Sequence, residues 1–166
     1  MIMILYTLLI CLAMVSDVSS GQSKAEWTLQ TLSGILCKRD YQRVAFSANL
    51  KSHYTTQGND HLVFANVIAN VGGDYDPTTG TFTCRVPGLY QFSWMIHQTK
   101  GRANSHFYLV RNNDVVFTMY HTGSNDNIAC TTYLQLKYGD TVWLKAYEAG
   151  RTIFANNYTT FGGMLV

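Results

Sequence analysis

The run FTCRVPGLYQFSW, residues 82–94, constrains the fold more than any other part of the sequence. After its Pro87-Gly88 corner, bulky apolar residues occupy every second position: Tyr90, Phe92, Trp94 and Ile96. Alternation at a period of two places these side chains on one face of a strand, where a second sheet can cover them. Proline donates no backbone hydrogen bond, and glycine adopts backbone conformations closed to other residues. The run therefore predicts two paired strands joined by a sharp corner.

From residue 44 onward the sequence alternates between short apolar segments and turn signals. The segments DPTTG at 76–80 and NND at 112–114 are typical of tight turns. No stretch in this part has helical periodicity, so the pattern predicts an all-β sandwich. Besides the strands on either side of Pro87, strands are expected at 44–50, 62–71, 106–111, 115–120, 131–137, 141–147 and 159–166, and loops at 51–61, 98–104, 121–127 and 148–158.

Seven residues have the spacing of the signature of the C1q globular-head domain: Phe64, Asn70, Tyr75, Phe82, Gly88, Tyr90 and Phe92. The chain resembles this family, part of the C1q/TNF superfamily, over residues 44–166. It departs from the family pattern at Trp94, where a Phe or Tyr is usual and a large aromatic is kept. The resemblance implies a jelly-roll β-sandwich of two five-stranded antiparallel sheets, with residues 44–166 as the globular domain.

Residues 1–20 are predicted to be a secretory signal peptide. Residues 2–15 are apolar, and the small residues at 18–20 precede an expected cut before Gly21. A membrane anchor is the alternative, but the apolar run is shorter than the ~20 residues that a bilayer-spanning helix needs. We therefore expect a secreted, extracellular protein without membrane insertion.

Residues 21–43 are expected to be an arm or a short oligomerisation stub. Leu29, Leu32 and Leu36 are spaced as on a coiled-coil seam, and Cys37 could link chains. Gly34 and several Ser and Thr residues disfavour helix and favour an irregular arm instead. No Gly-X-Y repeat is present, so a collagen stalk is not expected.

Composition and motifs narrow the function classes. Charged residues make up 13% of the chain and the net charge is +2, with no polybasic block, so nucleic acid is not an expected partner. The sequence has no nucleophile elbow, no phosphate-binding loop and no histidine pair at metal-binding spacing. The chain is therefore not expected to be an enzyme.

The segment 141–147 favours association with other subunits. Alternation puts Trp143, Lys145 and Tyr147 on one face and apolar residues on the other, so both faces are too apolar to be left in water. The resemblance to the C1q family implies a homotrimer with aromatic strand faces at its centre. The alternative is a monomer whose own loops cover that face.

The resemblance also bears on the cysteines. If the family's strand order holds, Cys84 and Cys130 lie on antiparallel neighbouring strands and could form a disulfide. Two buried free thiols are the alternative.

Two further residues are candidates for a ligand or a modification. Some relatives hold Ca²⁺ near the apex of the trimer, and Asp114 is the residue of this chain that we would assign to such an ion, although a turn aspartate usually bonds to its own backbone. Asn157-Tyr158-Thr159 is a glycosylation sequon.

Short C1q-domain proteins without collagen, which this chain resembles, commonly act as pattern-recognition lectins in innate immunity. We expect the trimer to bind microbial polysaccharide, lipopolysaccharide or acidic sugars through loops on a rigid sandwich. Cations can meet carboxylates or phosphates and tyrosine can stack on a sugar, which gives these candidate contacts: Lys100, Arg102, Arg151, Asn156 and Tyr158. The alternatives are a trimeric ligand of a cell-surface protein receptor, like the cerebellins and TNF-like cytokines, and a component of extracellular matrix.

Overall fold

The computed structural model describes residues 43–98, 104–122 and 127–166, which contain strands and no helix. The predicted signal peptide, the arm, Cys37 and the candidate contacts Lys100 and Arg102 lie outside the described residues. Within those ranges, no helix is long and apolar enough to cross a membrane.

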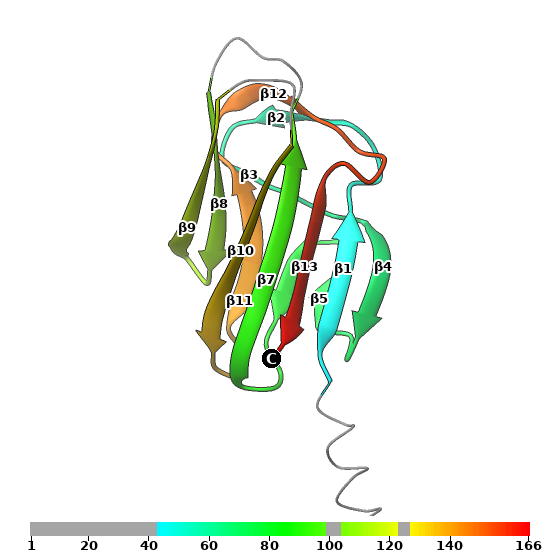
Figure 1. Ribbon diagram of the computed structural model, residues 1–166, viewed down its shortest axis with the longest axis vertical. Coiled ribbons are helices and arrows are strands. Elements are labelled where there is room, and N and C mark those ends of the chain that lie inside the picture. The colour runs from blue at the N-terminus through cyan, green and yellow to red at the C-terminus, as the bar shows by residue number, and fades with distance from the viewer. Residues whose placement is uncertain (1–42, 99–103, 123–126) are drawn as a thin grey trace, which may run out of the picture. The chain divides into compact units, whose positions relative to one another are not determined.

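The strands form two packed antiparallel sheets and a small two-stranded sheet (Figure 1). Their bounds are β1 (Ala45–Asn49), β2 (Tyr54–Gln57), β3 (Asp60–His61), β4 (Asn66–Val71), β5 (Tyr75–Asp76), β6 (Thr81–Thr83), β7 (Gly88–His97), β8 (Ser105–Arg111), β9 (Asp114–His121), β10 (Asn127–Leu136), β11 (Thr141–Ala146), β12 (Ala149–Ile153) and β13 (Thr160–Leu165). The five-stranded sheet has the order β10-β7-β13-β1-β4. The six-stranded sheet runs β5-β6-β11-β8-β9, with β3 also paired to β11, and β2 pairs with β12.

The prediction of an all-β jelly-roll sandwich is confirmed, with differences in detail. One sheet has six strands rather than five, because β3 adds to β11. Short strands β2, β3 and β12 lie within the expected loops 51–61 and 148–158. The expected strand 62–71 is shorter than predicted: Leu62 and Phe64 are buried but precede β4, which is mostly exposed.

The corner at Pro87 also differs from the expectation. The two strands beside it are not paired, because β6 belongs to the six-stranded sheet and β7 to the five-stranded one. Gly88 is not among the glycines with positive φ. Its lack of a side chain matters for packing, since a Cβ there would lie 2.5 Å from Cδ1 of Leu165. The corner therefore carries the chain from one layer to the other.

A connected cluster of aromatic rings lies in the core between the sheets. Phe46 of β1 stacks on Tyr75 at 4.5 Å between ring centroids and contacts Phe82 at 5.5 Å and Phe161 at 5.0 Å. The Tyr75 hydroxyl donates to the carbonyl of Phe64 over 3.1 Å, which satisfies the polar end of a buried ring. These rings, of which Tyr75 and Phe82 belong to the signature, therefore pack the two layers together.

Candidate functional site

The outward side of the five-stranded sheet presents a continuous surface whose make-up follows from strand register. Three rows cross all five strands: Tyr133, Gln91, Met164, Ala45 and Val71; Thr131, Ser93, Gly162, Ser47 and Ala69; and Ala129, Met95, Thr160, Asn49 and Asn66. None of these side chains is charged, and Asn49 of the third row is itself buried, with its amide bonded to Asn66 and Asn157. Tyr133, Met164 and Val71 are about half exposed, at 55%, 49% and 50%. We call these three rows the uncharged face.

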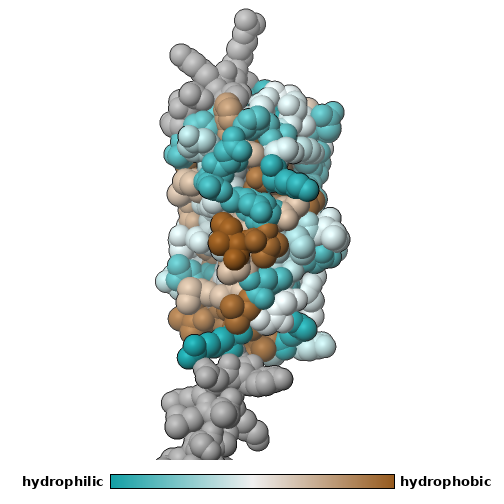
Figure 2. Space-filling view, turned by 90° about the vertical axis from the view of Figure 1, so that its right-hand side faces the viewer, coloured by the Kyte–Doolittle hydropathy of each residue, from teal (hydrophilic) through white to brown (hydrophobic). Residues whose placement is uncertain are grey.

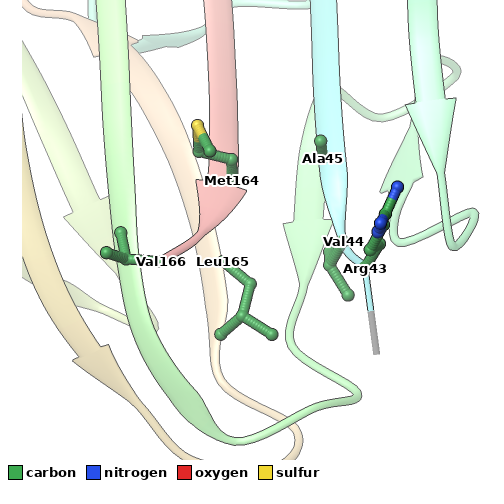
Figure 3. Close-up of a pocket in the computed structure, with 6 residues that line it drawn as sticks. All are labelled: Arg43, Val44, Ala45, Met164, Leu165 and Val166. Carbon is green, nitrogen blue, oxygen red and sulfur yellow. The ribbon is translucent and has the colours of Figure 1, made fainter. Parts of the chain in front are cut away.

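A hollow of about 330 Å³ lies at one end of this face, between the end of β13 and the start of β1 (Figure 3). Its lining consists of Arg43, Val44, Ala45, Met164, Leu165 and Val166. Five of these six residues are apolar. The hollow therefore extends the apolar character of the first row.

The edge strand β4 continues this surface around the side of the sandwich. Val67, Ile68 and Val71 of β4 are 37%, 65% and 50% exposed. Figure 2, which views this edge, shows hydrophobic side chains gathered at its middle and towards one end. Exposed apolar patches of this kind on a sheet edge mark contact surfaces.

The outward side of the six-stranded sheet carries aromatic and titratable side chains instead. The ring of His106 in β8 lies 5.0 Å from Tyr120 and 6.4 Å from Tyr147, and Tyr108 lies 5.7 Å from Tyr147. Tyr120 and Tyr147 are both 49% exposed. We call His106, Tyr108, Tyr120, Tyr147 and Glu148 the tyrosine cluster.

Glu148 joins the cluster through two hydrogen bonds from one residue. Nδ1 of His106 lies 2.7 Å from one carboxylate oxygen, and the backbone N–H of His106 donates to the other over 2.6 Å. Burial raises the pKa of Glu148, but these hydrogen bonds lower it more, so the net pKa lies below the ordinary value. Burial, together with the charge of Glu148, raises the pKa of the Tyr108 phenol. The cluster thus combines a carboxylate with an imidazole and the phenol hydroxyls of three tyrosines.

The segment 141–147 has the two faces that its alternation predicts. Val142, Leu144 and Ala146 are buried in the core, whereas Trp143 and Lys145 are partly exposed. His61 stacks on Trp143 with ring centroids 4.1 Å apart, so the chain itself shields part of this indole. Because His61 already shields part of the Trp143 indole, this side chain depends less on a second subunit for burial than the sequence implies.

Three predicted contact residues lie within the described ranges, and they fall in two places. Nε of Arg151 donates to Oγ of Ser105 over 3.1 Å, which holds the guanidinium against β8. Asn156 and Tyr158 are exposed in the turn before β13, and the Tyr158 ring lies 5.2 Å from His97. The prediction that these loops carry a ligand site stays a prediction.

The predicted disulfide is wrong in this structure, where Cys84 and Cys130 are free. Backbone hydrogen bonds with Gly139 and Asp140 hold Cys84 beside the turn that follows β10. Cys130 lies six residues before the end of β10 at Leu136, which is ~20 Å along a strand. A disulfide needs Cα atoms within about 7 Å, so the two sulfurs cannot meet. The strands are not neighbours either, since β6 and β10 belong to different sheets.

The other two candidate residues lie on exposed turns. Asp114 begins β9, and no group of three or more His, Cys, Asp or Glu residues within the described ranges could hold a metal ion around it or elsewhere. Asn157 has a left-handed φ of 69° and accepts a hydrogen bond from the side chain of Asn49. The Ca²⁺ role of Asp114 and glycosylation of Asn157 remain predictions.

The tyrosine cluster was not predicted from the sequence. Alternation does place His106 and Tyr108 on one face of the expected strand 106–111. Only the pairing of β8 with both β9 and β11, however, brings Tyr120 and Tyr147 to the same place. When paired strands are far apart in the sequence, no local pattern of residues shows which side chains they will bring together.

Comparisons with known proteins agree with the fold. The family described as C1q domain matches residues 45–166. Complement C1q tumor necrosis factor-related protein 3 of Homo sapiens is 31% identical over 127 residues, which cover 75% of this chain and 51% of that protein. Complement C1q tumor necrosis factor-related protein 2 of Homo sapiens is 31% identical over 139 residues, 78% of this chain and 47% of that protein. The chain thus spans about half the length of these curated relatives.

Solved structures show the same architecture. The globular domain of zebrafish complement 1qA protein has a TM-score of 0.62 at 21% identity, covering 75% of this chain and 98% of that one. Murine APRIL has a TM-score of 0.64 at 9% identity, covering 75% and 100%. These likenesses support the fold alone. Because the family match spans most of the chain and the curated relatives exceed 30% identity, we conclude that the chain belongs to the C1q domain family.

Proposed function

We propose that this chain is a secreted, trimeric recognition protein that binds microbial carbohydrate or other anionic surface ligands, and is not an enzyme. The observation that carries the proposal is the uncharged face. Burying charge costs free energy unless each charge is paired, whereas small and aromatic side chains can be desolvated at little cost, and amide side chains can be too when they are hydrogen-bonded. A surface that crosses five strands without one charged side chain is therefore suited to burial against other subunits.

In a closed trimer, the uncharged face of each subunit would be covered by the next subunit. In a heterologous contact, one patch of each subunit meets a different patch of the next, and a threefold rotation closes the ring. The uncharged face and the apolar β4 edge are two such patches on adjoining sides of the sandwich. Membership of the C1q domain family and the C1q/TNF-like fold support a trimer rather than a dimer.

Three subunits would present three copies of each ligand site. Linked weak sites bind a repetitive surface with much higher avidity than one site does, and microbial polysaccharides are repetitive. Exposed Asn156 and Tyr158 in the turn before β13 can supply an amide and an aromatic ring to such a ligand. The N-terminal segment expected to direct secretion agrees with a role outside the cell.

Two measurements on protein expressed from the full sequence test the proposal. Light scattering after size-exclusion chromatography should give three times the mass of one secreted chain. A glycan array should then show binding that specific free sugars displace. A single-chain mass would contradict the trimer, and an array without any bound glycan would contradict the lectin.

A second candidate function is a ligand for a cell-surface protein receptor. The names of the curated relatives favour it, since they are described as related to tumor necrosis factor. Such a ligand should bind one surface protein of a responsive cell saturably and without competition from sugars. Displacement by a free oligosaccharide would contradict this alternative and favour the lectin.

A further inference from the structure

The tyrosine cluster lies where three strands bring distant residues to one outward surface. His106 and Tyr108 come from β8, Tyr120 from β9, and Tyr147 follows β11. His106 is at the centre, with ring centroids 5.0, 6.3 and 6.4 Å from the three tyrosines. Half-exposed rings on a rigid sheet offer flat apolar area at little entropic cost, because their neighbours already restrict them.

The polar atoms of the cluster have unused hydrogen-bonding capacity. None of the hydroxyls of Tyr108, Tyr120 and Tyr147 is hydrogen-bonded to another residue that the structure describes. Glu148 engages Nδ1 of His106, so the other imidazole nitrogen is left for an external partner. A carboxylate has about four acceptor positions, and the two bonds from His106 occupy only two of them. The site can therefore both donate and accept hydrogen bonds beside its rings.

This combination matches the two surfaces of a pyranose sugar. A pyranose presents C–H bonds on its ring face and hydroxyls at its edge. The C–H face can pack on a tyrosine ring while the hydroxyls bond to phenol, imidazole and carboxylate groups.

The charge of the cluster selects among sugars. The hydrogen bonds from His106 favour the ionised form of Glu148, so the carboxylate that His106 holds beside the rings is an anion at neutral pH. A carboxylate accepts hydrogen bonds from sugar hydroxyls and repels a sulfate, phosphate or uronate. Lys145, opposite Tyr108 across the β8–β11 pair, adds a cationic hydrogen-bond donor beside the cluster.

We propose that the tyrosine cluster is a binding site for uncharged pyranose residues of a polysaccharide. The proposal rests on the carbohydrate-binding function proposed above and narrows its ligand class, since acidic sugars would have to bind elsewhere. Tyr147 and Tyr120 supply the stacking surface, and Glu148 accepts hydrogen bonds from the sugar hydroxyls. His106 holds the Glu148 carboxylate in position.

The test uses the full-length trimer on an array of β-glucan and mannan oligosaccharides as uncharged probes and of heparin and polysialic acid as anionic probes. Tyr147→Ala and Tyr120→Ala should each weaken binding to the uncharged probes at least about tenfold, the upper part of the range for loss of one stacked ring. Tyr138→Ala is the matched control, because Tyr138 is 75% exposed at the opposite end of β11. That variant should bind like the wild type.

Glu148→Gln separates a ligand contact from a purely structural role. Glutamine keeps the shape and removes the charge, so binding to uncharged probes should fall while the repulsion of anionic probes is relieved. The ratio of uncharged to anionic binding should therefore drop, and a general loss of structure would not change that ratio. Light scattering on each variant confirms that it is still assembled.

The outcomes distinguish the two proposals. If the wild type binds none of the probes, the carbohydrate-binding function is wrong and this site is wrong with it. If the wild type binds uncharged probes and the Tyr147, Tyr120 and Glu148 variants bind equally well, only the location at the tyrosine cluster is overturned. Binding by the wild type to anionic probes alone would overturn the assigned ligand class.

Discussion

The two outward faces of this sandwich are built by the same alternation and differ in chemistry. On the five-stranded sheet, three rows of side chains cross the strands without a charge. On the six-stranded sheet, rings surround a histidine–glutamate pair. The inward sides share one aromatic core. Alternation therefore decides which side chains are buried, and the residues at the remaining positions decide what each face can do.

The difference has an energetic consequence for assembly. Covering the uncharged face removes few strongly hydrated groups from water, so most of the apolar area buried there contributes to association. Covering the tyrosine cluster would desolvate the Glu148 carboxylate, which costs several kcal/mol unless a partner compensates. The first face is suited to permanent contact and the second to an exchangeable, hydrated ligand.

The largest effect is expected from removing the ring that both faces depend on. Phe46 is 4% exposed and contacts the rings of Tyr75, Phe82 and Phe161. Phe46→Ala should lower the free energy of unfolding by about 3–5 kcal/mol, from lost burial and the cavity left behind. Denaturant unfolding at fixed protein concentration measures it, and trimer mass and sugar binding should be lost together.

Phe117→Ala is the control for that variant. Phe117 is only partly buried, and its described ring contact is with Trp94 at 5.3 Å between centroids. Its loss should cost less than that of Phe46. Equal costs for the two variants would show that the ring cluster around Phe46 is not what couples the faces.

A charge placed on each face in turn gives the next largest effect. Ser93→Glu puts a carboxylate in the middle row of the uncharged face, where it would be buried unpaired in the trimer. The subunit dissociation constant should rise at least about tenfold, because an unpaired charge at an interface costs several kcal/mol. Sedimentation at a series of concentrations measures the change.

Thr118→Glu provides the matched substitution on the other face, since Thr118 is exposed opposite Tyr108. It should leave the trimer intact. If Thr118→Glu dissociates the trimer and Ser93→Glu does not, the roles assigned to the two faces are reversed.

The sequence was informative wherever the pattern was local. The alternation around Phe46 and Phe92 identified core strands, and the residues at 141–147 have the buried and half-exposed faces expected of them. The signature residues gave the family and the sandwich. These features depend on neighbouring positions within one strand and on the burial of large apolar side chains. Both can be predicted from the alternation of residues along the sequence.

What failed in the sequence-based predictions depended on how strands pair. The run around Pro87 predicts two paired strands joined by a corner, but its strands join different sheets. The disulfide prediction required Cys84 and Cys130 to lie on neighbouring strands, but the structure places the two cysteines apart. The tyrosine cluster needs β9 and β11 on either side of β8, an arrangement that no local pattern specifies.

The smallest effect concerns pH and should appear on the six-stranded face. The pKa of Glu148 lies below its ordinary value of 4.5, because the hydrogen bonds from His106 outweigh the effect of burial. A carboxyl whose folded pKa is depressed stabilises the protein above its unfolded pKa, and this contribution is lost as pH falls through the folded value.

Glu148→Gln should therefore destabilise the protein at pH 7 by less than about 1 kcal/mol, given partial solvent screening, and the difference from the wild type should vanish in acid. Unfolding curves from pH 7 to 3 at one protein concentration measure it. His106→Ala removes the imidazole but keeps the backbone N–H that bonds to Glu148, so it should reproduce only part of this pH dependence. Adding it to Glu148→Gln should have little further effect, because the carboxylate that both bonds reach is already gone. Ser93→Glu, unfolded over the same pH range, should keep the pH-dependent stabilisation that Glu148 provides. Loss of the Glu148 contribution in the Ser93 variant would show that the two faces are not chemically separate. An undiminished contribution in the His106 variant would show that the imidazole does not lower the pKa of Glu148.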